Sequence, residues 1–219
     1  MNHERVQSIL LKLPSLFLGL FMFSMGVVMN LNSNLGMSPW GVFQVGLSQS
    51  TTLTLGQISQ IVGLGVLVVG WAMGFPPGFA TFMNMYFIGL FIDKIIQFSL
   101  IPEPTVLVSQ LLLLLGGIIM IGAGSYFYLN PKLGAGPRDG LMMGLVQKTD
   151  LPVYIVRGAI EVTVLVLGYF LGGPVGVGTL VTALTIGYSV QLAFKLGGYD
   201  KKAEHLNLYQ LVKQLAQTS

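Results

Sequence analysis

Leu35-Gly36-Met37-Ser38-Pro39 returns 98 positions later as Leu133-Gly134-Ala135-Gly136-Pro137. The match extends without a gap over residues 13–97 and 111–195, and most of the identical positions are Gly, Pro, Asn or Thr. Because these residues set the direction of the backbone, the two segments are expected to follow the same path in space. The sequence therefore predicts one unit present twice within a single domain over residues 1–219.

The composition is that of a protein dissolved in lipid. Hydrophobic residues make up 53% of the chain and charged residues 9%, whereas a soluble domain carries about 25% charged residues. Six apolar runs approach the length of about 20 residues that a membrane span needs. They cover residues 15–31, 54–73, 78–97, 106–128, 153–171 and 177–196. We expect an all-α integral membrane protein with six transmembrane helices, and the lipid bilayer as its main partner.

Two further apolar segments are too short to span. Trp40–Gln49 and Arg138–Gln147 each follow a proline, which is favoured at the first position of a helix. Each runs for about ten residues, or about 15 Å of helix, against about 30 Å of hydrocarbon. They are interpreted as half-helices, one in each repeat, that dip into the membrane or lie at its interface.

Basic residues orient the helices, because cytoplasmic loops retain Lys and Arg during insertion. With a cytoplasmic N-terminus, only Lys94 falls on the outer side. The inner side then receives Arg5, Lys12, Lys132, Arg138, Lys148, Lys195, Lys201, Lys202 and Lys213. Both termini are therefore expected in the cytoplasm. Three spans per copy is an odd number, so the repeats are expected to be inverted, with residues 38–40 facing the exterior and residues 136–139 facing the cytoplasm.

Inverted halves give two similar states that open to opposite sides, which is the geometry of a secondary transporter, although some channels and non-transporting membrane proteins share it. The solute site is expected where the halves meet, at the N-termini of the half-helices, whose partial positive charge favours an anionic solute. The candidate binding residues are Ser38, Trp40, Asn84, Arg138 and Asp139. The plainer alternative is that the Gly and Pro residues only form tight turns into interfacial helices.

Glu161 falls near the middle of the fifth apolar run, where a charge costs a few kcal/mol. Arg157 lies four residues earlier and on the same helical face, so an ion pair is the simplest way to satisfy both groups. The first copy has Ser59 and Gly63 at these positions. Two readings stay open: a buried pair that fixes the helix, or a carboxyl group that takes up a proton and couples its movement to transport.

Several classes of function are not supported. Cysteine is absent, and no Ser-His-Asp, HExxH or Walker-type pattern occurs. The two histidines, His3 and His205, lie in the termini, away from any candidate site. A net charge of +3 is too small and too scattered for nucleic-acid binding. We expect no enzyme activity, no metal site and no cofactor.

Residues 198–219 are predicted to form an amphipathic cytoplasmic tail. Its apolar residues follow helical spacing: Leu208, Leu211, Val212 and Leu215. The pattern does not decide between a helix on the membrane surface and one that docks on a partner.

Four motifs resemble the YczE group of the YczE/YyaS/YitT membrane proteins. They are Gly36–Trp40, Leu133–Gly140, the pair Arg157 and Glu161, and Leu171–Thr179, within a resemblance that covers about residues 13–196. The resemblance implies a small multi-pass protein of the bacterial cytoplasmic membrane and leaves its substrate open. The outer motif of the family often has an acidic residue after the Trp, where this chain has Gly41, so the resemblance gives Asp139 no symmetric partner.

Two alternatives stand beside a transporter. The chain could be a substrate-binding subunit of a larger transport complex, although such a subunit needs no inverted symmetry. It could also be a regulator that acts through its tail, as a homo-oligomer or with a membrane partner. A regulator should lose function when residues 198–219 are removed, whereas a transporter should be largely indifferent.

Overall fold

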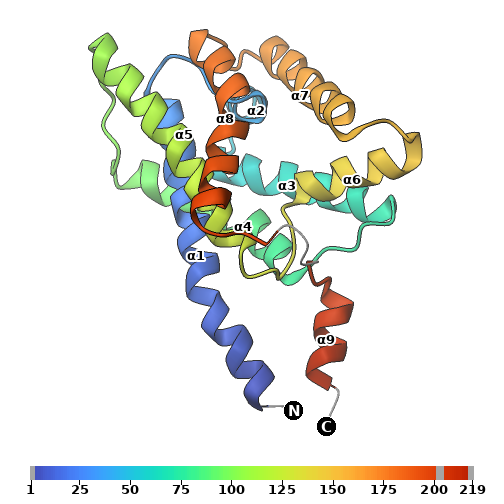
Figure 1. Cartoon of the computed structure of the whole chain (residues 1–219). Coiled ribbons are helices and arrows are strands. Elements are labelled where there is room, and N and C mark those ends of the chain that lie inside the picture. Colours follow the sequence, from blue (N-terminus) through green and yellow to red (C-terminus); the bar gives the residue numbers. More distant parts are fainter. Residues whose placement is uncertain (1–2, 201–204, 217–219) are drawn as a thin grey trace.

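The computed structural model describes residues 3–200 and 205–216, and every regular element in this part of the chain is a helix. Six helices are long and apolar enough to cross a membrane by length and composition: α1 (His3–Asn32), α3 (Leu55–Ala72), α4 (Phe79–Gln97), α5 (Leu107–Leu129), α7 (Val153–Phe170) and α8 (Val177–Leu196). The others are α2 (Pro39–Gln49), α6 (Pro137–Thr149) and α9 (Leu208–Ala216). The expected all-α class with six spans is confirmed at this level (Figure 1).

The helices α1 and α5 share the most extensive contact among the described helices, and they run antiparallel. Gly19 lies against Gly124, and Gly26 lies against Gly117; a Cβ placed on Gly26 would lie 2.6 Å from the Gly117 carbonyl oxygen. The Ser15 hydroxyl donates to the Phe127 carbonyl at 2.9 Å. Because small residues let two backbones approach this closely, they hold the centre of the bundle together by packing.

Each linker before a short helix docks on the start of a helix from the other half of the chain. The Leu35 carbonyl accepts from the Gly178 N–H at 2.6 Å, and the Leu133 carbonyl accepts from the Ala80 N–H at 2.8 Å. Gly36 has φ +107° and Gly134 has φ +130°, conformations that favour glycine. The half-helices α2 and α6 are therefore positioned by bonds that cross between the two halves.

The pairs α3/α4 and α7/α8 differ. Gly56 of α3 and Gly89 of α4 are in backbone contact. The Asp93 carboxylate at the end of α4 caps α3, because it accepts from the Thr54 hydroxyl at 2.6 Å and from the Gly56 N–H at 2.8 Å. By contrast α7 and α8, both described over their full length, make at most slight contact, and α7 lies well to one side of α8 (Figure 1).

The tail docks on the bundle. The Leu206 N–H donates to the Lys132 carbonyl at 2.9 Å, and the Leu208 N–H donates to the Pro77 carbonyl at 3.0 Å. Leu211 is buried in the core, as the apolar face of α9 requires. Residues 201–204 and 217–219 of the expected tail lie outside the described residues. Among the described side chains of the expected apolar face, Leu208 and Val212 remain 40% and 57% exposed, so the bundle covers this face at Leu211 only.

Candidate functional site

One cavity of about 780 Å³ lies where the halves meet. It receives side chains from every spanning helix and from both half-helices. All seven residues that the sequence singled out line it: Ser38, Trp40, Asn84, Arg138, Asp139, Arg157 and Glu161. They come from α2, α4, α6 and α7 and their N-terminal linkers, so the fold gathers at one place residues that are up to 123 positions apart.

Trp40 and Arg138 meet inside this cavity. The Arg138 guanidinium carbon lies 4.4 Å from the centre of the Trp40 ring, a cation–π arrangement. Both are the second residue of their half-helix, and they occupy equivalent positions in the two copies. They were expected on opposite sides of the membrane. The structure instead brings them together, because the N-terminus of each half-helix points into the bundle.

The starts of the two half-helices are built differently. The Ser38 hydroxyl accepts from the Gly41 N–H at 3.3 Å and so caps α2, as its residue type predicts. The equivalent Gly136 has no side chain to cap α6. A Cβ at Gly136 would lie 3.2 Å from the Tyr128 hydroxyl and 3.7 Å from the Asn84 amide nitrogen. The Asp139 carboxylate instead accepts from the Gly136 N–H, so the start of α6 is capped by an acidic residue of its own first turn and faces the Tyr128 and Asn84 side chains.

Four charged groups share the cavity. Glu161 interacts most strongly with Arg138 and next with Arg157, and the Trp40 indole N–H is within hydrogen-bonding reach of its carboxylate. Asp139 interacts most strongly with Arg157. The sequence paired Arg157 with Glu161, and the structure adds Arg138 as the stronger partner. With all four groups ionised their charges cancel, which limits the cost of holding them at membrane depth.

The tail contributes two residues that the sequence did not suggest. Tyr199 and His205 line the cavity, and the Tyr199 hydroxyl oxygen lies 2.9 Å from His205 Nε2. The Lys132 ammonium lies 3.4 Å from the centre of the Tyr199 ring. Burial, and then the neighbouring Lys132, lower the pKa of His205 below its ordinary value. The expectation that His205 lies away from any candidate site is therefore wrong, because the tail returns to the bundle.

Because the tail docks on the bundle, its removal cannot distinguish a regulator from a transporter. Removing residues 198–219 would remove part of the cavity wall, including Tyr199 and His205. Loss of function after truncation would then be expected of a transporter as well as of a regulator. The sequence of the tail does not reveal that it lines the cavity. Helical spacing shows only that one face of the tail is apolar, and it does not show what that face contacts.

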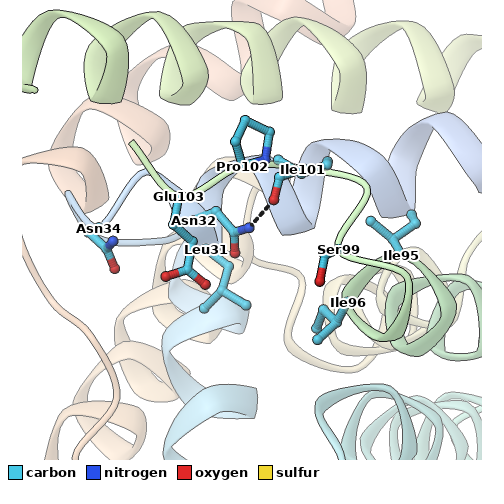
Figure 2. A pocket seen from close by; sticks show the side chains of 9 residues that line it. All are labelled: Leu31, Asn32, Asn34, Ile95, Ile96, Ser99, Ile101, Pro102 and Glu103. Carbon is cyan, nitrogen blue, oxygen red and sulfur yellow. Dashed lines mark hydrogen bonds between the residues drawn. The ribbon is translucent and has the colours of Figure 1, made fainter. Parts of the chain in front are cut away.

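A second pocket, of about 520 Å³, lies between the ends of α1 and α4 and the loop that follows α4 (Figure 2). The Asn32 amide donates to the Ile101 carbonyl at 2.8 Å and ties this loop to α1. Glu103 is its one acidic side chain. Among the described residues no group of three His, Cys, Asp or Glu side chains could hold a metal ion. The pocket is best explained as a loop attachment.

Comparison with known proteins gives the family. A family of unknown function, DUF6198, matches residues 10–195. The chain belongs to this family. The uncharacterized membrane protein YczE of Bacillus subtilis is 37% identical over 185 residues, which cover 83% of this chain and 84% of that protein. An uncharacterized protein of Haemophilus influenzae is 38% identical over 159 residues, 73% of this chain and 72% of its own length.

A more distant relative also matches the chain. The uncharacterized protein YyaS of Bacillus subtilis is 26% identical over 170 residues, 75% of this chain and 83% of that protein. The resemblance to the YczE group is thus confirmed, and with the six candidate spans it makes this chain a multi-pass membrane protein. No solved structure matches the chain.

Proposed function

We propose that this protein is a small secondary transporter of the bacterial cytoplasmic membrane, with both termini in the cytoplasm and two inverted halves that carry an anionic solute through the central cavity. The observation that carries the proposal is the meeting of Trp40 and Arg138. Equivalent residues of two copies touch only near the axis that relates the copies. Their contact in a cavity suits a site that both states of the protein share.

The contacts of the glycines support the inverted arrangement. Consider two residues, i and j, of the first half and their copies, i′ and j′, in the second half. Under two-fold symmetry, a contact between i and j′ requires an equivalent contact between j and i′. Gly19 and Gly26 have Gly117 and Gly124 as copies, and Gly19 lies against Gly124 while Gly26 lies against Gly117. The two linker hydrogen bonds obey the same rule. In addition, α3 and α7 have bounds that differ by one common offset.

Arg138 is the residue best suited to bind the solute. Its planar guanidinium matches a carboxylate or phosphate group with two parallel hydrogen bonds. The starts of α2 and α6 meet at the same place and add their helix dipoles, which the Ser38 hydroxyl and the Asp139 carboxylate partly offset. Trp40 fixes one face of the guanidinium, which leaves its edge for a ligand. Asn84 and the Ser38 hydroxyl stand beside this point as neutral hydrogen-bonding groups.

Glu161 would couple a proton to this binding. While Glu161 is ionised it holds Arg138; once it takes a proton, Arg138 is free to bind an anion. A proton and a monoanion together leave the net charge of the cavity unchanged. The free-energy cost of holding that net charge within the membrane is therefore the same for the loaded and the empty protein. The coupling needs no enzymatic step and no cofactor.

The proposal is tested with the purified protein in vesicles. Slowly permeating carboxylates and phosphates are offered with an inward proton gradient, and the labelled anion inside is counted. The wild-type protein should accumulate at least one anion, and Arg138→Ala should remove this accumulation. Glu161→Gln should lose the gradient-driven part and still exchange anion for anion. Glu103→Gln is the matched control, because Glu103 lines the second pocket, beside the loop that follows α4, and not the central cavity. This variant should behave as wild type.

Three results would each reject a part of this function. Gradient-driven accumulation that survives in Glu161→Gln would show that another group carries the proton. Accumulation that survives in Arg138→Ala would remove the anion site. If Glu161→Gln instead fails to give a monodisperse, folded protein, the pair with arginine is structural, and the coupling role is rejected.

A further inference from the structure

The cavity has an opening between two membrane-spanning helices. Arg157 and Gly158 of α7, and Ala183 and Gly187 of α8, line the cavity and are exposed, and the two helices make at most slight contact with each other. No atom lies within 4 Å of the position that a Cβ would take at Gly158 or at Gly187. Because both helices span the membrane, this gap faces lipid rather than water.

The same place in the other half of the chain is closed. Gly89, the counterpart of Gly187, lies directly against Gly56. The counterpart of Gly56 in α7 is Tyr154, whose side chain is 75% exposed and stands at the gap. A tyrosine cannot take the place of a glycine in backbone contact, so α7 and α8 cannot pack as α3 and α4 do. The opening is therefore fixed by the sequence.

The wall beside the gap is apolar on the side of α8. From α8 the cavity receives Ala183, Ile186, Gly187, Val190 and Phe194. The groups that would hold an anion, Arg138 and the starts of the half-helices, lie deeper, where Trp40 is only 5% exposed. A volume of about 780 Å³ is within the range of small-molecule sites, about 300–1,000 Å³. The path from lipid thus runs along the apolar α8 side to the Arg138 guanidinium, while the α7 side carries Arg157 at the gap.

We propose that the solute is an amphiphilic monoanion, a carboxylate on a single apolar chain, which enters from the bilayer through the gap between α7 and α8. This proposal rests on the anion site of the proposed function and names its substrate class. The carboxylate binds at Arg138 while the chain lies along α8. A small polar anion has no reason to use an entrance that faces lipid, whereas an amphiphile already resides there.

Trp40 is a built-in probe of this site. The chain has two tryptophans, and Trp71→Phe leaves Trp40 alone. We would record its fluorescence in lipid nanodiscs during titration with 2-bromodecanoate, whose bromine quenches on close approach. Quenching should be saturable, should be reversed by decanoate, and should not be reversed by decanol or lactate. Arg138→Gln should abolish the saturable part.

Filling the gap tests the entrance. The double variant Gly158→Leu/Gly187→Leu should raise the concentration for half-saturation at least tenfold or slow the approach to saturation by as much. Gly65→Leu is the matched control, since Gly65 also has no atom within 4 Å of its Cβ position and does not line the cavity. It should titrate as the parent does, and equal melting temperatures would show that all variants are folded.

The outcomes separate this proposal from the proposed function. If lactate competes as well as decanoate and the filled gap has no effect, the amphiphile and its entrance are rejected while the anion site stands. If decanol competes as well as decanoate, the site is merely apolar, and the proposal is rejected. If Arg138→Gln changes the binding of no anion, both proposals fall together.

Discussion

At the scale of single residues, the two halves follow the same backbone path but differ in which of them carries the charged side chains of the cavity. The four charged groups of the cavity all belong to the second half, on α6 and α7. Their first-half counterparts carry no charge: Trp40 for Arg138, Gly41 for Asp139, Ser59 for Arg157 and Gly63 for Glu161. The two halves thus have similar backbones, while the charged side chains of the cavity come from the second half alone. Changes at these four residues are expected to alter function before they alter the fold.

Asp93 is an asymmetric residue of the opposite kind, with a structural role. Its carboxylate caps α3 and joins it to α4 through bonds of 2.6 and 2.8 Å. Asp93→Asn keeps the shape and removes the charge that strengthens both bonds, so it should lower the free energy of unfolding by about 1–2 kcal/mol. Thermal unfolding in detergent measures this. Lys94→Gln, at the exposed neighbour, should change little, and equal melting of the two variants would contradict the cap.

At the scale of elements, local signals predicted well and long-range packing was missed. The half-helices were expected from Trp40 and Arg138 onward, and they begin one residue earlier, at Pro39 and Pro137, because proline at a helix start is a local signal. The seven candidate residues were chosen from local features, namely the starts of the half-helices and polar or charged groups at membrane depth, and the structure places all seven around one cavity. The gap between α7 and α8 depends on how whole helices pack, and the sequence alone did not indicate it.

The tail is the element that a change of pH should affect. Burial lowers the pKa of His205 below 6.5, so between the lowered value and about 6.5 the released tail binds more protons than the docked one. Docking is therefore strongest above about pH 6.5 and is lost as pH falls through the lowered pKa. Hydrogen exchange over residues 205–216, corrected for the intrinsic effect of pH, should show this loss. His205→Gln should flatten it, and a loss that persists in this variant would rule out the histidine.

At the scale of the whole molecule, the proposed transport mechanism depends on the relation between the halves. The antiparallel α1 and α5 and the crossed linker bonds tie each half to the other, so neither half is expected to move alone. The closed α3/α4 pair and the open α7/α8 pair differ at Gly56 and Tyr154, so this difference is expected to persist in both states of a two-state cycle. In the second state the tilt of the halves around Trp40 and Arg138 would be reversed, while that contact stays at the centre.

Equivalent loops test this arrangement directly. Ser50 follows α2 and Lys148 lies at the equivalent position near the end of α6; both are exposed. The chain has no cysteine of its own, so Ser50→Cys and Lys148→Cys each create a single reactive site. In intact cells an impermeant maleimide should label the first variant and not the second, and after permeabilisation it should label both. A cysteine at Leu64, a lipid-facing position in the middle of α3, should stay unlabelled throughout. If both loop positions react from the same side, the halves are parallel, and the carrier mechanism built on their inversion must be abandoned.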